Sequence, residues 1–338
     1  TMQEPSSYPL TTKRLLKELG VNIGDFDFAY DQQFYKRHKL TGGIYFNKDK
    51  WGADSLIPFD IANFRDWMPL AEPAIDAKSA VKRMPISDSA KRQLLGLLEL
   101  EEDQIPHLTH GQKWDYLYTL SYKDFLKRHL KVTEQEVFDI FQDLTSDSGV
   151  GIDSVAAASA LWGAGMPGWD AAGLPEVEPE EAYIHHFPDG NASIARQLVR
   201  KMIPQAASGN TIKDLVTSVF DYTKLDQQDA SVRIRLDSTV VDVRHHSAKN
   251  LENGLSVTYV RDAQAHRIKA KAVVMACDNA VIPYICPELP ATQREALSFQ
   301  VKVPILYTNV ALRNWRAWKS LGVGAVVCPD SYHINASL

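Results

Sequence analysis

The hydrophobic pattern divides the chain into a mostly helical first half and a second half that contains strands. Residues 1 to about 183 carry apolar side chains mainly at helical spacing, with few of the alternating runs that are typical of strands. Helix candidates in this half are Ser87 to Glu99, Ser121 to Leu130 and Asp153 to Trp162. The pattern therefore predicts a helical region with irregular, aromatic-rich connections.

One predicted helix start has a recognisable capping sequence. Thr133 is followed three residues later by Glu136, which fits a capping box, and an apolar stripe at helical spacing comes next. We expect Thr133 to cap this helix. We expect the stripe to lie in the core; it consists of Val137, Phe138, Ile140, Phe141 and Leu144.

The second half follows an acidic stretch, Glu176 to Glu181. Residues Ala192 to Ile203 predict an amphipathic helix that stops at Pro204, with its polar face formed by Arg196, Gln197, Arg200 and Lys201. Strands are predicted from alternating or continuous apolar runs at Val232 to Leu236, Ser238 to Val243, Leu255 to Val260, Ile268 to Ala276 and Val301 to Leu312.

The run that begins at Ile268 stands out among these strands. Its second part, Ala272 to Cys277, is apolar enough to form a strand buried on both faces, and it ends in the small residues Ala276 and Cys277. In doubly wound sheets the ligand lies outside the carboxyl ends of such strands. This segment is therefore a candidate wall of a ligand site.

Composition and charge narrow the class of protein. A length of 338 residues with 45% hydrophobic and 23% charged residues is typical of a globular protein of about two domains. The net charge of −5 gives no support for a nucleic-acid partner and permits a cationic ligand. The most apolar stretch, Val155 to Trp169, contains Pro167 and falls short of a membrane span. We therefore expect a soluble protein without a membrane span.

The cysteines and the chain ends leave the compartment open. Cys277, Cys286 and Cys328 are odd in number, which argues against a disulfide framework. The chain begins with Thr1 and shows no signal peptide. We expect it to be a segment of a longer protein.

Two motifs with a chemical interpretation are better explained as structural. A literal G-x-G-x-x-G at Gly163 to Gly168 follows an Ala-rich helical segment and contains Pro167, so we expect a loop rather than a phosphate site. The pairs His185-His186 and His245-His246 lack further ligands at metal-binding spacing. No metal site is predicted.

A turn before the amphipathic helix is more informative. Phe187-Pro-Asp-Gly190 predicts a tight turn, and Asn191 is a suitable N-cap for the helix that follows. The turn would direct the helix N-terminus and its N–H groups at a ligand. A purely structural turn would explain these residues equally well.

The order of these parts resembles the flavin-containing amine oxidase and phytoene desaturase superfamily, and most closely its bacterial spermidine dehydrogenase branch. Three sequence strings carry the resemblance: Gly-Met-Pro-Gly at residues 165–168, Phe-Pro-Asp-Gly-Asn-Ala-Ser-Ile-Ala-Arg at 187–196, and Val-Pro-Ile-Leu-Tyr-Thr-Asn-Val-Ala-Leu-Arg-Asn-Trp at 303–315. The resemblance extends over nearly the whole chain. The glycine-rich phosphate loop and the final glycine-rich segment of the family are not found.

The resemblance implies an incomplete FAD-binding Rossmann-like amine oxidase fold of α+β or α/β class, with a helical and mixed-sheet substrate domain. Residues 1–183 would form a helical insert of the substrate domain and residues 184–290 the central part of the FAD-binding domain. Residues 291–338 would begin the substrate-domain sheet. The chain then corresponds to the middle of such an enzyme.

The same resemblance implies site residues. In the family a turn with its helix, a short strand that contacts the adenine and a later strand all lie beside FAD. The matching positions here are Pro188, Asp189, Gly190, Asn191, Val240, Val241, Ala276 and Cys277. Tyr307 lies on the strand that forms a substrate-cavity wall in related enzymes, where it would contact the amine; a core tyrosine is the alternative. No catalytic residue is assigned.

The implied function is FAD-dependent oxidation of an amine C–N bond in polyamine catabolism, with a substrate such as spermidine, as part of a longer chain. This segment alone is expected to be inactive. Haem is a possible second cofactor, and the electron acceptor and the compartment, periplasmic or cytoplasmic, stay open. The alternatives are a carotenoid-desaturase-like flavin oxidoreductase and a truncated, non-catalytic binding module.

Overall fold

The computed structural model describes residues 2, 4–63, 68–175, 185–246, 253–299 and 301–338. The acidic stretch and the predicted boundary at residue 183 lie outside these ranges. The chain forms two compact units. Unit 1 comprises Thr1–Lys13, Asn22–His186 and Pro304–Leu338, and unit 2 comprises Arg14–Val21 and Phe187–Val303.

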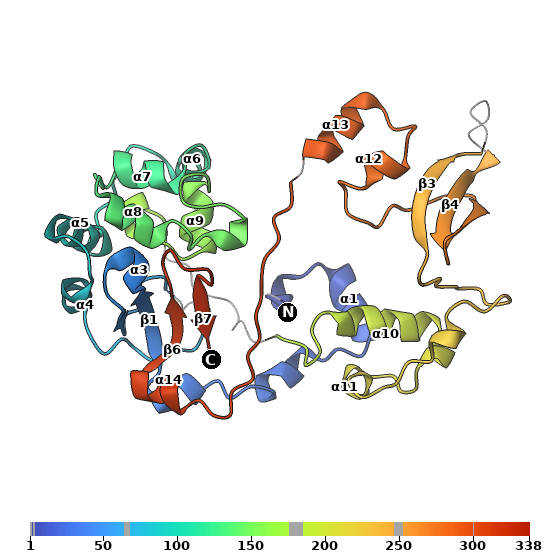
Figure 1. Cartoon of the computed structure of the whole chain (residues 1–338), viewed down its shortest axis with the longest axis horizontal. Helices are drawn as coiled ribbons and strands as arrows, with labels where there is room; N and C mark the ends of the chain where they lie inside the picture. The colour runs from blue at the N-terminus through green and yellow to red at the C-terminus, as the bar shows by residue number, and fades with distance from the viewer. Residues whose placement is uncertain (1, 3, 64–67, 176–184, 247–252, 300) are drawn as a thin grey trace. The chain divides into compact units, whose positions relative to one another are not determined.

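A four-stranded mixed sheet with the order β2-β1-β6-β7 lies in unit 1. Strand β1 (Thr41–Phe46) pairs antiparallel with β2 (Ser55–Ile57) and parallel with β6 (Val323–Val327). Strand β7 (Asn335–Ser337) is antiparallel to β6 and forms one edge. All five residues of β6 are buried. The sheet thus joins the early and late parts of the chain, as Figure 1 shows.

Helices cover this sheet in unit 1 (Figure 1). The predicted helix at Ser87 to Glu99 is confirmed, because the Ser87 hydroxyl accepts a hydrogen bond from the Ala90 N–H at 3.2 Å and caps the helix. Ser121 caps the next predicted helix in the same way. The helices here are α4 (Ala77–Arg83), α5 (Asp88–Leu98), α6 (His110–Leu117), α7 (Tyr122–Arg128), α8 (Gln135–Phe141) and α9 (Ala157–Gly163).

Further short helices complete unit 1. They are α2 (Phe34–His38), α3 (Lys48–Trp51) and α14 (Arg316–Leu321), while α1 (Leu10–Glu18) crosses from unit 1 into unit 2. The ring of Trp315, next to α14, lies 5.0 Å from that of Phe34 and 4.6 Å from that of His38. Trp315 therefore packs the late part of the chain against α2.

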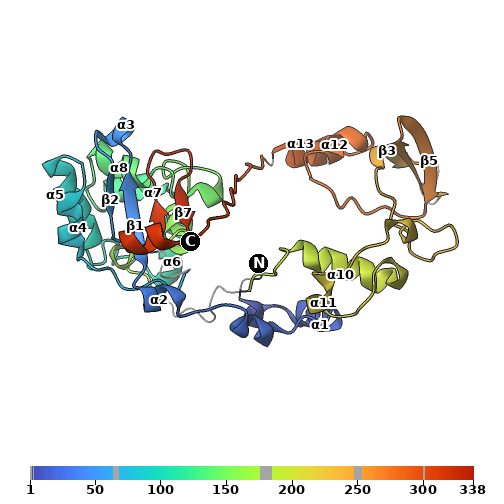
Figure 2. The same ribbon diagram turned by 60° about the horizontal axis from the view of Figure 1, so that its bottom comes forward.

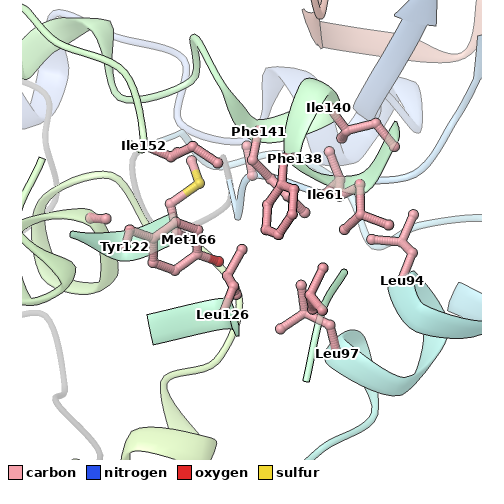
Figure 3. Close-up of a cluster of buried hydrophobic side chains, with 14 of the residues drawn as sticks. Ile61, Leu94, Leu97, Tyr122, Leu126, Phe138, Ile140, Phe141, Ile152 and Met166 are labelled. Atoms are coloured by element: carbon pink, nitrogen blue, oxygen red, sulfur yellow. The ribbon is translucent and has the colours of Figure 1, made fainter. Parts of the chain in front are cut away.

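The core of unit 1 forms where α5, α7 and α8 meet (Figure 3). The predicted stripe of α8 is confirmed, since Phe138 and Phe141 are buried against Leu94 of α5 and Leu126 of α7. Burial of each such side chain contributes roughly 1.5–3 kcal/mol to folding. Tyr122 is also fully buried, and its hydroxyl donates to the Pro167 carbonyl at 2.7 Å.

The predicted capping box at Thr133 is wrong. Helix α8 begins at Gln135, and the Thr133 hydroxyl instead accepts a hydrogen bond from the Gln93 amide at 2.8 Å. The Glu136 carboxylate accepts from the Ser87 N–H at 3.1 Å. Both side chains are thus used to join α8 to α5 rather than to cap their own helix.

The G-x-G-x-x-G segment forms a loop, as predicted. It begins at the last residue of α9, and Met166 within it is buried. Gly168 has φ +104°, and a Cβ there would lie 3.3 Å from Leu130 and from Phe125. The glycine is therefore required for packing against the core.

Unit 2 contains a three-stranded antiparallel sheet with the order β3-β4-β5. Its strands are β3 (Thr239–His245), β4 (Leu255–Arg261) and β5 (Gln264–Ala270), and its helices are α10 (Ala192–Met202), α11 (Ile212–Leu215), α12 (Ile282–Ile285) and α13 (Ala291–Phe299). Asp262 and Ala263, both with positive φ, form the tight turn between β4 and β5. The predicted strands at Ser238 to Val243 and Leu255 to Val260 are confirmed.

The chain is thus of mixed α+β class, with helices and two small sheets. Two strand predictions are wrong, and a third is confirmed only in its first three residues. Residues 232–236 and 301–312 are irregular, and the run that begins at Ile268 stays in the sheet only as far as Ala270. Instead of being buried on both faces, Val274 is 88% exposed. A strand requires a neighbouring backbone, and among the described residues no strand pairs with residues 232–236, 271–276 or 301–312.

The predicted helix α10 is confirmed, but its buried face is polar. Ser193, Gln197 and Arg200 are buried, whereas Met202 is 48% exposed. The Gln197 amide donates to the carbonyls of Leu19 at 2.7 Å and of Asn210 at 3.0 Å. Figures 1 and 2 show α10 beside α11. The chain that leads into α11 also accepts hydrogen bonds from Arg200, at the carbonyls of Ser208 and Thr211.

Candidate functional site

The residues predicted to bind FAD occupy two places in unit 2. Val240, Ala276 and Cys277 line one cavity of about 310 Å³. Pro188, Asp189, Gly190 and Asn191 form the turn before α10 and are not among its lining residues. Two predicted segments that are distant in sequence, at Val240 and at Ala276 to Cys277, therefore line one candidate pocket, and the turn is a separate feature.

The cavity in unit 2 is apolar. Its floor is the cross-strand pair Val243 and Val257, both buried, and Ile285 of α12 closes one side. The remaining wall is the irregular segment from Val273 to Cys277. Such a lining favours the flat apolar face of a ring over a charged group.

A bulge in β3 decides which of two neighbouring valines lines the cavity. Val240 pairs with Tyr259 and Asp242 with Thr258, so Val241 is the extra residue on its strand. Val240 lines the cavity, whereas Val241 does not. Of the two predicted adenine contacts, the geometry favours Val240.

A cysteine beside this cavity is unlike a reactive thiol. Burial raises the pKa of Cys286, and the nearby Cys277 raises it further. Burial likewise raises the pKa of Cys328 in unit 1. Both thiols are therefore held in the protonated, poorly nucleophilic form.

The turn before α10 has the predicted geometry. The Gly190 N–H donates to the Phe187 carbonyl at 3.0 Å, and Gly190 has φ +77°. Asn191 occupies the N-cap position, but its side chain makes no capping hydrogen bond, so that part of the prediction is wrong. The Asp189 carboxylate instead accepts from the Ser193 hydroxyl and ties the turn to the helix.

The charge of Asp189 is offset within unit 2. Arg196 donates to its carboxylate at 2.8 Å and also to the Ser218 carbonyl at 3.0 Å. A Cβ placed on Gly190 would meet no atom within 4 Å, so the backbone of the turn is open to close approach. The turn can accommodate a ligand at Gly190 without repulsion from an unpaired carboxylate.

Tyr307 lies in unit 1, on the irregular segment that follows Pro304. Its side chain is 79% exposed, so the alternative of a buried core tyrosine is wrong. The neighbouring Thr308 hydroxyl lies 2.9 Å from Nε2 of His333, which holds this segment near the end of the chain. The phenol ring is thus accessible to a ligand.

A second cavity, which the sequence analysis did not select, lies in unit 1. It has a volume of about 470 Å³, and Tyr118, Asp147 and Trp162 are among its lining residues. The only sequence feature that could have indicated this cavity was the aromatic-rich connections between the helices. Their arrangement around one cavity depends on contacts between α6 and α9 that periodicity does not indicate.

Neither a metal centre nor a membrane-crossing helix is found in the described part of the chain. No group of three or more His, Cys, Asp or Glu side chains there could hold a metal ion. Of the predicted non-ligand histidines, His245 lies with Nδ1 2.6 Å from the Glu288 carboxylate. In the same residues, every helix is too short or too polar to cross a bilayer.

No protein-family model and no curated protein matches the chain. The resemblance to the amine oxidases therefore remains a hypothesis, which rests on the strings at residues 165–168, 187–196 and 303–315.

Proposed function

We propose that the chain is part of an FAD-dependent amine oxidoreductase that oxidises a C–N bond of a polyamine such as spermidine. One observation supports this more than any other. Val240, Ala276 and Cys277, assigned to FAD from separate stretches of sequence, line a single apolar cavity. A chance resemblance gives no reason for these positions to converge.

The residues of unit 2 fit part of an FAD molecule. The cavity of about 310 Å³ is at the lower end of the range for ligand pockets, so it suits one ring system rather than the whole cofactor. Val240, Ala276 and Cys277 would hold the adenine end, and the open backbone at Gly190 would lie beside the phosphates. When bound, FAD would supply the hydride acceptor for oxidation of the amine C–N bond; loss of a hydride and a proton from the amine would give an imine, which water would hydrolyse.

The proposed role of the protein is to bind and orient. Arg196 would keep the Asp189 carboxylate neutralised, so that the turn does not repel a pyrophosphate. Tyr307 would contact the alkyl chain or the ammonium group of the amine through its exposed ring. No side chain is assigned a proton-transfer role.

An absorption spectrum tests the proposal most directly. The full-length protein that carries this chain is purified, supplied with FAD, and recorded before and after spermidine is added without oxygen. We expect flavin bands that bleach with spermidine and that persist with 1,8-octanediol, an uncharged control. A Soret band would add haem as a second cofactor.

The other outcomes favour the alternatives. Flavin that is bound but reduced only by an apolar polyene would replace the amine by a carotenoid-like substrate, which the apolar lining of the cavity also suits. A protein that takes up no FAD would contradict the oxidoreductase proposal and leave the non-catalytic binding module.

A further inference from the structure

The cavity of unit 1 combines aromatic faces with a carboxylate. It lies between the end of α9, the loop after α8, and the edge strand β7. Trp162 and Tyr118 supply rings that are 53% and 60% exposed. Among its described lining residues, Asp147 carries the only charge.

The aromatic rings are held in place by one another. Trp114 lies 6.3 Å from Trp162 and 6.5 Å from Tyr118, measured between ring centroids. Trp169 lies 5.9 Å from Trp162, and its indole N–H donates to the Pro175 carbonyl at 3.1 Å. The two lining rings are therefore presented by a packed cluster, which lowers the entropy cost of binding a ligand against them.

The carboxylate is also presented by an ordered loop. The buried Thr145 hydroxyl donates to the Val150 carbonyl at 2.9 Å, and the Ser148 N–H donates to the Thr145 carbonyl at 2.9 Å. No ion pair found among the described residues uses Asp147. Its negative charge is thus available to a ligand.

We propose that this cavity binds the ammonium group of a small alkyl amine. The Asp147 carboxylate accepts hydrogen bonds from the ammonium, and the faces of Trp162 and Tyr118 attract its charge. The alkyl chain packs on apolar lining such as Met68 and Leu144. The same carboxylate disfavours anions. The inference rests on the proposed function and deepens it by assigning one ammonium group of the polyamine to this cavity; Tyr307, which is not among the lining residues, would contact another part of the same amine.

Calorimetric titration of the full chain with spermidine tests this site. We expect Asp147→Asn to weaken binding about tenfold and Asp147→Lys to abolish it, because a charge-assisted hydrogen bond is lost or reversed. Trp162→Leu should weaken binding about threefold to fivefold, while Trp162→Phe should retain most of the affinity. Glu101→Gln, which removes an exposed carboxylate outside the cavity, should have no effect.

The ligand controls separate charge from shape. Binding should weaken as salt is raised, and 1,8-octanediol should bind at least tenfold more weakly than spermidine. Thermal unfolding of each variant shows whether it is folded. Equal affinity of spermidine for the wild-type protein and a folded Asp147→Lys variant would overturn the inference, as would equal affinity for the diol.

The proposed function and the cavity can fail separately. Tight spermidine binding that depends on Asp147, without flavin reduction, would support the cavity and contradict the oxidoreductase. Flavin reduction with a KM for spermidine unchanged by Asp147→Lys would support the oxidoreductase and overturn the cavity as the amine site.

Discussion

The guanidinium group of Arg200, buried in unit 2, donates a hydrogen bond of 2.5 Å to the partly exposed carboxylate of Asp214. The same group donates to the carbonyls of Ser208 at 2.8 Å and Thr211 at 2.6 Å, and to the side chain of Gln197. One side chain of α10 thus fixes the loop that leads into α11. A buried cation is tolerated because its N–H groups reach acceptors.

Replacing Arg200 by methionine should therefore destabilise unit 2. The change removes the donor from the buried Gln197 side chain and from the part-buried acceptors of Ser208, Thr211 and Asp214, and we expect a loss of roughly 3 kcal/mol in the free energy of unfolding. Lys201→Met, at an exposed cation on the same helix, should cost under about 1 kcal/mol. Urea unfolding followed by circular dichroism measures both. Equal effects would show that the polar cluster around Arg200 does not stabilise the fold.

Acid should weaken unit 2 through Asp226. Hydrogen bonds from Arg235 and then Arg233 lower the pKa of Asp226 to about 2, below the value of about 3.9 in an unfolded chain. The carboxylate therefore stabilises the fold above about pH 4, and this contribution is lost as the pH falls toward 2. We expect Asp226→Asn to lower the urea midpoint at pH 6 and to differ less from wild type near pH 2.

Two conditions sharpen the Asp226 experiment. Because the ion pairs are partly exposed, 1 M salt should reduce the difference between wild type and Asp226→Asn at pH 6. Asp229→Asn changes an exposed neighbour and should leave the midpoint at pH 6 unchanged. A pH profile of Asp226→Asn that runs parallel to that of wild type from pH 6 to pH 2 would contradict this assignment.

Gly168→Ala should destabilise unit 1 by about 1–3 kcal/mol. The backbone at φ +104° is unfavourable for alanine, and the new Cβ would press on Leu130 and Phe125 at 3.3 Å. Gly96→Ala, at an open position within α5, should instead stabilise by about 0.5–1 kcal/mol. Thermal unfolding compares the two. A neutral Gly168→Ala would mean that this loop is not packed as described.

Val240→Lys should lower FAD affinity at least tenfold, because it places a charge in an apolar cavity, whereas Val241→Lys should have little effect. The two substitutions are chemically identical and one residue apart, so they control for each other. Flavin content after dialysis, with a check of thermal unfolding, gives the result. An equal loss of flavin in both variants would show that the β3 bulge does not decide which valine contacts the cofactor.

Elements whose partners are close in sequence could be predicted. The apolar stripe of α8 and the helices α5 and α7 depend on side chains only a few residues apart, although the caps expected at Thr133 and Asn191 do not form. The polar buried face of α10 could not be predicted, because Gln197 finds its acceptor at Leu19, 178 residues earlier. Periodicity reports which residues share a face and not what that face meets.

The strands show the same limit. The apolar pattern at residues 301–312 predicts a strand as strongly as any other, yet the sheet of unit 1 takes Val323–Val327 instead. The two segments differ in whether a partner strand is present. The backbone of β1 pairs with β6 from Thr41↔Val323 onward. At the candidate site, the resemblance selected Val240 and Val241 together, and only the ladder register separates them.

The parallel pairing of β1 with β6 affects how the protein is made. When β1 leaves the ribosome, the 276 residues between Phe46 and Val323 have yet to be synthesised. Unit 2 is complete once Val303 has been synthesised, so this unit can fold during synthesis. The sheet of unit 1 cannot form until β6 has also been synthesised. In ribosome-bound intermediates, unit 2 should accordingly be folded while the sheet of unit 1 is still incomplete.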